Sequence, residues 1–260
     1  MSLKIEVLFP EINNLYGDLF NVELLKHSYP EIDIIHTSLK SEPLFLTEKP
    51  NMIYMGSVTE RGQELGARKL YAYRKRILEL IEDNTLILLT GNAIELFSSY
   101  IELETGEQIR CLDILPAIAQ RHMMFRYNSL YIGKFMDNDI VGFKSQFSHL
   151  YGDNSDCYLF DTVKGSGLNP NVKKEGFRIN NLLCTYLIGP VLLLNPPLAK
   201  YILELMGIKD PVLAFEQECY ESYYERVKEF SEPGKVFEGE LIKVKKEDKN
   251  AGKDTTGRDA

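Results

Sequence analysis

The sequence predicts an α/β protein with an open, mostly parallel sheet that carries helices on both faces. In the N-terminal third, short apolar runs of strand length alternate with segments of helical periodicity, which is typical of a parallel sheet covered by helices. One run, Leu86–Leu89, is wholly apolar, as expected of a central strand buried on both faces. Hydrophobic residues make up 44% of the 260 residues, enough for a substantial core.

The early elements can be placed from periodicity and from turn residues. The run from Lys4 is apolar, partly β-branched and stopped by Pro10, and a later helix shows apolar residues three and four apart with charges between them. The expected strands are Lys4–Phe9, Ile32–Ile35, Asn51–Met55 and Leu86–Leu89, and the expected helices run through Leu24 and Leu25 and through Leu70, Tyr73, Ile77 and Ile81.

The middle of the chain predicts antiparallel additions to this sheet. Thr105 and Gly106 form a turn signal between alternating residues, which favours a hairpin over 100–109. Further strands are expected at Tyr131–Ile132, Ile140–Phe143, Tyr158–Phe160 and Cys184–Leu187. A helix is expected from Pro197 to Met206, and a last helix from near Pro211 with the apolar stripe Val212, Phe215, Cys219, Tyr223, Val227 and Phe230.

Residues 1–244 are expected to form one domain, followed by a tail. From Lys245 onward the chain is rich in Lys, Asp, Thr and Gly and has almost no apolar residue. Such a segment cannot bury enough surface to offset its ordering entropy, so 245–260 is predicted to be a disordered, charged tail.

Composition argues against several functional classes. The formal net charge is −8, which is unsuited to binding a nucleic-acid backbone, and the basic residues between Arg68 and Arg76 have the spacing of a solvated helix face. No stretch reaches the ~18–20 apolar residues of a membrane span, and no signal peptide is recognised. The four cysteines and four histidines are scattered, which favours free thiols in the cytoplasm and no metal site. Without a Walker A or GxGxxG sequence, no cofactor is expected.

The most informative local pattern is a strand that runs into Thr90, Gly91 and Asn92. A buried strand followed by a small residue and a glycine is the sequence of a nucleophile elbow, where a strained turn exposes one side chain above the sheet. The alternative is an ordinary strand-to-helix turn. If it is an elbow, Thr90 should have an uncommon backbone conformation.

Several segments resemble the class I glutamine amidotransferase-like domains of the cobyric acid synthase and lipid II isoglutaminyl synthase type. The specific parts are Asn14-Leu-Tyr-Gly-Asp18 with Asn21, and Glu175-Gly176 through Thr185-Tyr-Leu-Ile188-Gly-Pro190 to Asn195-Pro196. Gly142-Phe143 and Gly165-x-Gly167-x-Asn169 fall between them in the same order. The resemblance covers roughly residues 4–210 and implies a flavodoxin-like sheet, with a domain that delivers ammonia to an ATP-dependent ligase.

At the positions that the resemblance assigns to catalysis, this sequence differs. The family's nucleophile lies in Cys-Gly-Gly, which corresponds here to Thr90, Gly91 and Asn92, and the family's base is a His that corresponds to Ile188. The glycine-rich oxyanion loop corresponds to Gly56, Ser57 and Val58, with two glycines replaced. A threonine hydroxyl needs an adjacent base, which isoleucine cannot provide. Cys184 precedes Ile188 by four on an expected strand, so both would point to the same face and a relocated nucleophile is conceivable, but a buried strand cysteine usually acts as a small hydrophobe. His122 or His149 could lie near the sheet edge, but a lone His is more often a surface or hydrogen-bonded residue than a base.

Three functions therefore remain open. The first is a non-catalytic binding or regulatory subunit of an ATP-dependent, Mur-ligase-like amidating complex. The second is an active glutaminase with rearranged catalytic residues. The third is a binder of a small molecule, such as a glutamine-like one, that reuses the pocket around Thr90 and Gly56 with the binding positions Ser57, Val58, Gly91 and Asn92.

Overall fold

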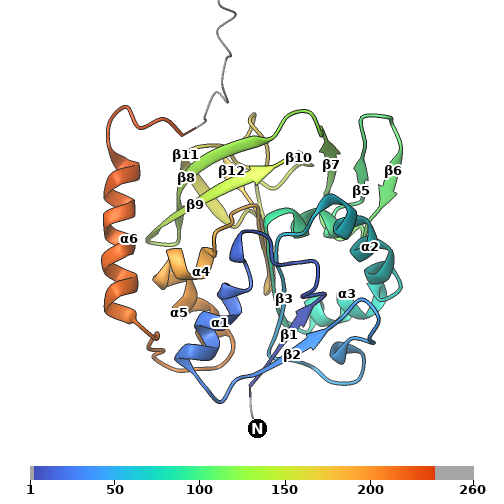
Figure 1. The fold of residues 1–260 in the computed structure, drawn as a ribbon, viewed down its shortest axis with the longest axis horizontal. Helices are drawn as coiled ribbons and strands as arrows, with labels where there is room; N and C mark the ends of the chain where they lie inside the picture. The colour runs from blue at the N-terminus through green and yellow to red at the C-terminus, as the bar shows by residue number, and fades with distance from the viewer. Residues whose placement is uncertain (1–2, 238–260) are drawn as a thin grey trace, which may run out of the picture.

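The chain is built around a six-stranded sheet in the order β13–β14–β4–β3–β1–β2, as seen in a computed structural model that describes residues 3–237 (Figure 1). All neighbouring strands are parallel except β13, which pairs antiparallel with β14 at one edge. This confirms the mostly parallel sheet. The strands are β1 (Lys4–Leu8), β2 (Asp33–Thr37), β3 (Met52–Met55), β4 (Leu86–Thr90), β13 (Phe177–Ile179) and β14 (Leu182–Thr185).

Helices cover both faces of this sheet, as the alternation of its side chains requires. Along β4, Ile87 and Leu89 enter one apolar cluster with α2 and α3, whereas Leu86 and Leu88 enter a second cluster with α1 and α5. All five residues of β4 are buried, which confirms its predicted central position. The helices are α1 (Phe20–Ser28), α2 (Glu60–Tyr71), α3 (Arg74–Glu82), α4 (Val191–Leu194), α5 (Pro196–Leu205) and α6 (Glu216–Ser231), and the 3-10 helices are η1 (Leu15–Gly17), η2 (Leu44–Leu46) and η3 (Gly91–Phe97).

Two four-stranded sheets lie above the main sheet in the view of Figure 1. They confirm the expected antiparallel additions, although β7 and β10 were not anticipated. Their orders are β10–β7–β5–β6 and β12–β11–β8–β9. The strands are β5 (Tyr100–Glu102), β6 (Gln108–Arg110), β7 (Ala117–Arg121), β8 (Tyr127–Phe135), β9 (Asn138–Gln146), β10 (Ser148–Gly152), β11 (Phe160–Lys164) and β12 (Lys174–Glu175).

Two helix predictions are wrong at their boundaries. The single helix expected through Leu70 and Ile81 is two helices, because Tyr73 leaves the helical conformation (φ −105°, ψ 6°) and α3 begins after it. The last helix begins five residues after Pro211, since Phe215 is left-handed (φ 54°) and the Glu216 side chain accepts the Leu213 N–H at 2.8 Å. Val212 and Phe215, expected in the buried stripe, are therefore exposed.

Other sequence predictions concern the membrane, metals and the tail. Within residues 3–237 no helix is long and apolar enough to cross a membrane, and no three His, Cys, Asp or Glu side chains gather as a metal site. The four cysteines are unpaired. The tail predicted at 245–260 lies outside the described residues.

Candidate functional site

The predicted site residues converge where the parallel strands end. Thr90 is the last residue of β4 and pairs with Thr185 at the end of β14, and Gly56 directly follows β3. The carboxyl edge of a parallel sheet is where ligands bind in such folds. Thr90, Thr185 and Gly56 therefore lie together at the carboxyl edge of the main sheet.

Asp18 is the centre of this site. Its Oδ2 accepts hydrogen bonds from Thr90 Oγ1 at 2.9 Å and from the Ser57 N–H and Oγ at 2.9 and 2.7 Å. Its Oδ1 accepts the Gly189 N–H at 3.4 Å. Burial raises the pKa of the Asp18 carboxyl, and the bonds from Ser57, Thr90 and Gly189 oppose that rise. One carboxylate thus joins the ends of β3 and β4 to the segment after β14.

The side chain of Thr90 is held by hydrogen bonds within the protein. Its side chain is fully buried, and its hydroxyl donates to Asp18 and lies 3.0 Å from the Tyr54 hydroxyl. Tyr54 in turn donates to the Asp18 backbone carbonyl at 2.8 Å. A nucleophile needs a base to accept its proton, and the hydrogen-bond partners of the Thr90 hydroxyl among the described residues are a carboxylate and a phenol, not a thiol or an imidazole.

The expectation of an uncommon backbone at Thr90 is wrong. Thr90 is extended (φ −119°, ψ 152°), because it still pairs within the sheet. The left-handed residue is Gly91 (φ 59°), so the tight turn falls one residue later. A Cβ on Gly91 would lie 1.9 Å from Ser57 Oγ and 3.0 Å from Ile188 Cγ2. The space into which an elbow side chain would project is thus filled by Ser57.

The backbone amides of the 56–58 loop are also engaged. The Ser57 N–H donates to Asp18, and the Val58 N–H donates to Asn92 Oδ1 at 2.9 Å. Asn92 Nδ2 returns a bond to the Val58 carbonyl at 2.9 Å. An oxyanion hole requires donors aimed at an empty position, and these two donors are already satisfied within the chain.

Ile188 lies beside Gly91. Its N–H donates to the Phe143 carbonyl at 3.0 Å, and its side chain is buried. The next residue, Gly189, is left-handed (φ 88°) and turns its N–H toward Asp18. An isoleucine at this point closes the site with an apolar wall that cannot accept a proton.

The alternative nucleophile and bases do not reach this site. Cys184 pairs with Leu89 across the sheet and lies in the apolar cluster, where burial raises the pKa of its thiol well above the ordinary value. His149 bonds Gln146 at 3.1 Å, and burial lowers its pKa to about 4. His122 lies 3.8 Å from Glu104.

A second buried carboxylate lies behind the elbow. Glu95 accepts hydrogen bonds from Gln63 at 2.8 Å, from Tyr186 at 3.0 Å and from Ser148. Gln63 also donates to the Asn92 carbonyl at 2.7 Å and accepts from Arg121 at 2.6 Å. Burial raises the pKa of Glu95. This network fixes η3 against α2, β7 and β10.

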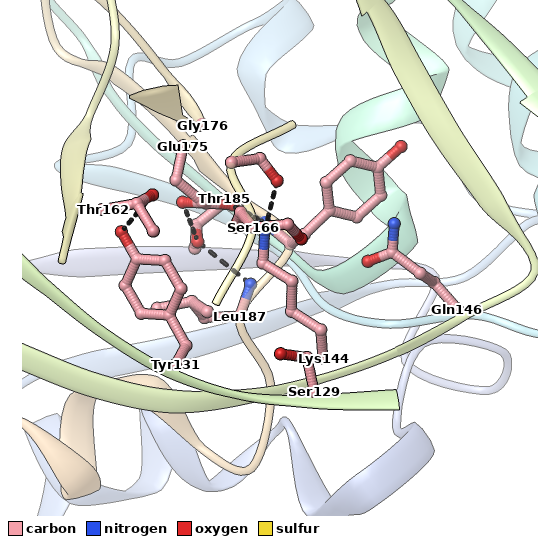
Figure 2. Close-up of polar contacts among 12 residues, drawn as sticks. Ser129, Tyr131, Lys144, Gln146, Thr162, Ser166, Glu175, Gly176, Thr185 and Leu187 are labelled. Carbon is pink, nitrogen blue, oxygen red and sulfur yellow. Dashed lines mark hydrogen bonds and ion pairs between the residues drawn. The ribbon is translucent and has the colours of Figure 1, made fainter. Parts of the chain in front are cut away.

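A buried ion pair, Lys144 and Glu175, lies behind the segment that leads to Ile188 (Figure 2). Lys144 donates to the carbonyls of Ser166 and Gly167 at 2.9 and 2.6 Å and lies 3.5 Å from Glu175. Glu175 accepts hydrogen bonds from the Tyr186 N–H at 2.8 Å and from the Thr185 hydroxyl. Burial lowers the pKa of Lys144, and the charge of Glu175 opposes that change. The pair thus anchors the chain between β14 and Ile188.

A hollow of about 320 Å³ opens above the site. Ser57, Val58 and Asn92 line it, whereas Thr90, Gly91 and Gly56 lie buried outside its lining. The pocket is therefore displaced from the predicted one. Its wall also includes Tyr16, Glu60, Arg126, Gln146 and Phe147. Tyr16 and Ser145 separate it from a more apolar hollow of about 510 Å³ along Ile188 and Gly189.

Sequence reasoning missed the residues that fill the site. Asp18 belongs to the quoted Asn14–Asp18 motif, and an acidic residue in an otherwise turn-forming segment was the available signal. Gln63, Glu95 and Arg126 carry no such signal, since only the fold brings them together with Asn92.

Comparisons with known proteins agree with this architecture. No family model matches the chain. The chain is 26% identical over 193 residues to the lipid II isoglutaminyl synthase (glutamine-hydrolyzing) subunit GatD of Staphylococcus aureus, covering 74% of this chain and 79% of that protein. It is 23% identical over 210 residues to the Streptococcus pneumoniae subunit of the same name, covering 76% and 78%. A crystal structure of a glutamine amidotransferase matches with a TM-score of 0.53 and 15% identity, over 78% of this chain and 99% of that one.

These findings confirm the resemblance and the fold. The chain is homologous to the GatD subunits at 23–26% identity, and it has the class I glutamine amidotransferase fold.

Proposed function

We propose that this chain is a non-catalytic, glutamine amidotransferase-like subunit that binds an ATP-dependent, Mur-ligase-like partner in an amidating complex. The homologous GatD proteins are named as subunits of a glutamine-hydrolyzing synthase. This chain aligns with them over 74–76% of its length, and loss of catalytic side chains would leave surface residues elsewhere on the chain unchanged.

The proposed loss of catalysis rests on one observation. The left-handed elbow residue is Gly91, and Ser57 Oγ, held by Asp18, fills the space where a side chain at 91 would project. Together with the apolar Ile188, this leaves neither a nucleophile above the turn nor a base beside it. In related triads the loss of one member costs on the order of 10⁴–10⁶ in rate.

The test is a glutaminase assay on the purified chain, alone and with its co-purified partner, over a pH series. We expect ammonia release at the background rate in both samples. Turnover that Ser57→Ala or Cys184→Ser abolishes would contradict the proposal and support a glutaminase with rearranged residues. The partner is tested by affinity purification and mass spectrometry, and recovery of the chain alone would contradict the complex.

A second candidate is retention of a glutamine-like ligand without hydrolysis. The hollow above Ser57 is lined by one acidic side chain, Glu60, and one basic side chain, Arg126, which suits the two charges of a free amino acid. Isothermal titration with glutamine, glutamate and asparagine tests this. Binding that Glu60→Gln and Arg126→Ala each weaken supports it, and no heat at millimolar ligand rejects it.

A further inference from the structure

A separate hollow, of about 580 Å³, lies where the β5–β6 hairpin meets the helices α2 and α3 (Figure 1). The helices contribute Tyr71 and Arg74 to its wall, and the hairpin contributes Tyr100 and Arg110. A volume of several hundred Å³ suits a small-molecule ligand. The residues of this wall do not line the hollows beside the candidate site, so a ligand here would be independent of the proposed function.

Arg110 brings a positive charge to this hollow that no ion pair neutralises within residues 3–237. Its guanidinium lies over the ring of Tyr71, 4.4 Å from the ring centroid. Such a contact with the face of a ring is attractive and uses none of the N–H donors of the guanidinium. In the described part of the chain the Arg110 side chain donates no hydrogen bond either. Its donors are therefore held in place and remain available to a ligand.

Arg74 is the second guanidinium of the hollow, and the backbone fixes its orientation. Its Nε donates to the Leu112 carbonyl at 2.5 Å, and its Nη2 donates to the Asp113 carbonyl at 2.9 Å. Its Nη1 has no hydrogen-bond partner among the residues that the structure describes. A group that is already oriented loses less freedom when it binds a ligand.

One carboxylate also lines the hollow, and it already has partners. Asp113 Oδ1 accepts the Ser99 hydroxyl at 2.6 Å, and its Oδ2 lies 3.9 Å from Arg74 Nη2. Two arginines against one aspartate leave an excess of one positive charge, although the whole chain has a formal net charge of −8. The hollow therefore favours an anion that the rest of the surface repels.

We propose that this hollow binds a phosphate group, either as free phosphate or as the phosphate of a small ester. Guanidinium groups bind phosphate through directed, charge-assisted hydrogen bonds. The donors come from α3 and from β6, and the phenols of Tyr71 and Tyr100 and the amide of Gln108 lie in the same wall. Tetrahedral phosphate oxygens accept hydrogen bonds from several directions, whereas the two oxygens of a carboxylate lie in one plane.

Arg110→Gln is the variant that tests the site, because Arg110 has no hydrogen bond or ion pair within the described chain that the substitution would remove. It should weaken phosphate binding by about 10- to 100-fold. Arg68 is a matched control, since it is an exposed arginine of α2, three residues before Tyr71, and lies outside the wall of the hollow. Arg68→Gln removes the same charge and should change the affinity by less than about twofold. Asp113→Asn should strengthen binding, because it removes a negative charge and keeps an oxygen for the Ser99 hydroxyl.

Isothermal titration of the purified chain with inorganic phosphate, pyrophosphate and adenosine monophosphate measures these affinities, and thermal unfolding without ligand checks that each variant folds. Binding that Arg110→Gln weakens and Arg68→Gln does not supports the proposal. Tighter binding of adenosine monophosphate than of phosphate then identifies an ester as the ligand, and equal affinities identify the free ion. The proposal is overturned if none of the three binds at millimolar concentration, or if the two arginine variants weaken binding equally, which would show general charge attraction. Binding of citrate without binding of phosphate would also overturn it, since the hollow would then take a carboxylate.

Discussion

The occupied elbow predicts that even one added carbon at position 91 is costly. In Gly91→Ala, the alanine must keep the left-handed backbone of Gly91 (φ 59°), which costs a non-glycine residue about 1–2 kcal/mol. The new Cβ would also lie 1.9 Å from Ser57 Oγ, and such overpacking costs about 1–3 kcal/mol. The free energy of unfolding should therefore fall by about 2–5 kcal/mol.

Two matched variants separate these contributions. Gly106 is left-handed (φ 82°) with nothing within 4 Å of its potential Cβ, so Gly106→Ala should show only the backbone cost of about 1–2 kcal/mol. Ser57→Gly removes the obstacle but also the hydroxyl bond to Asp18, while the backbone N–H bond remains, so it destabilises on its own. In Ser57→Gly/Gly91→Ala the loss should be smaller than the sum of the single losses by about 1–3 kcal/mol.

Denaturant unfolding monitored by circular dichroism measures all four variants against the wild type. The reasoning is refuted if Gly91→Ala costs no more than Gly106→Ala, or if the double variant shows no coupling. Either result would mean that Ser57 does not hold the space above the turn.

Three further predictions concern buried groups. Because burial raises the pKa of Asp18, its folded form keeps a proton to higher pH than the unfolded chain does. The contribution of Asp18 to the free energy of unfolding should therefore grow as pH falls toward the ordinary range of an aspartate and be lost as pH rises through its raised pKa, and a pH series on Asp18→Asn should show a shallower dependence. Lys144→Met leaves the Glu175 charge buried and unpaired, so chemical unfolding should show a loss of about 3–5 kcal/mol, with partial recovery in Lys144→Met/Glu175→Gln; equal losses would contradict a coupled pair. In a native thiol titration with Ellman's reagent, Cys157 should react first, and Cys184, whose thiol pKa burial raises, only after denaturation; early Cys184 labelling would show that the sheet opens.

The sheet could be predicted because its signals are local. The runs that form β3 and β4 are continuously apolar up to their last residues, the run of β1 is apolar except for Lys4 and Glu6, and the three runs are followed by Gly56, Gly91 and Pro10, respectively. The break at Tyr73 could not be predicted, because its apolar spacing continues from α2 into α3. The late start of α6 could not be predicted either, because neither the left-handed Phe215 nor the bond between the Glu216 side chain and the Leu213 N–H alters the apolar spacing. β7 and β10 were missed because their residues alternate only weakly and pair with segments distant in sequence.

Only the location of the site could be predicted from the sequence. The elbow pattern and the resemblance located the carboxyl ends of β3, β4 and β14, and the structure brings Ile188 beside Gly91. That Thr90 and Ile188 are the former nucleophile and base positions stays a prediction. The sequence could not indicate that the turn falls one residue later, or that Asp18 and Ser57 fill the space, because both depend on side-chain packing between distant segments.

The bond between Ser57 and Asp18 has an evolutionary consequence. If the chain is non-catalytic, as proposed, a nucleophile that projects from the left-handed turn would need a side chain at 91, a smaller residue at 57 and a base at 188, and a side chain at 91 alone lowers stability while Ser57 is present. A lineage that carries this chain must therefore pass through less stable, inactive intermediates before selection for catalysis can act. Under the proposed function, the filled turn therefore makes a return to catalysis depend on several changes at once.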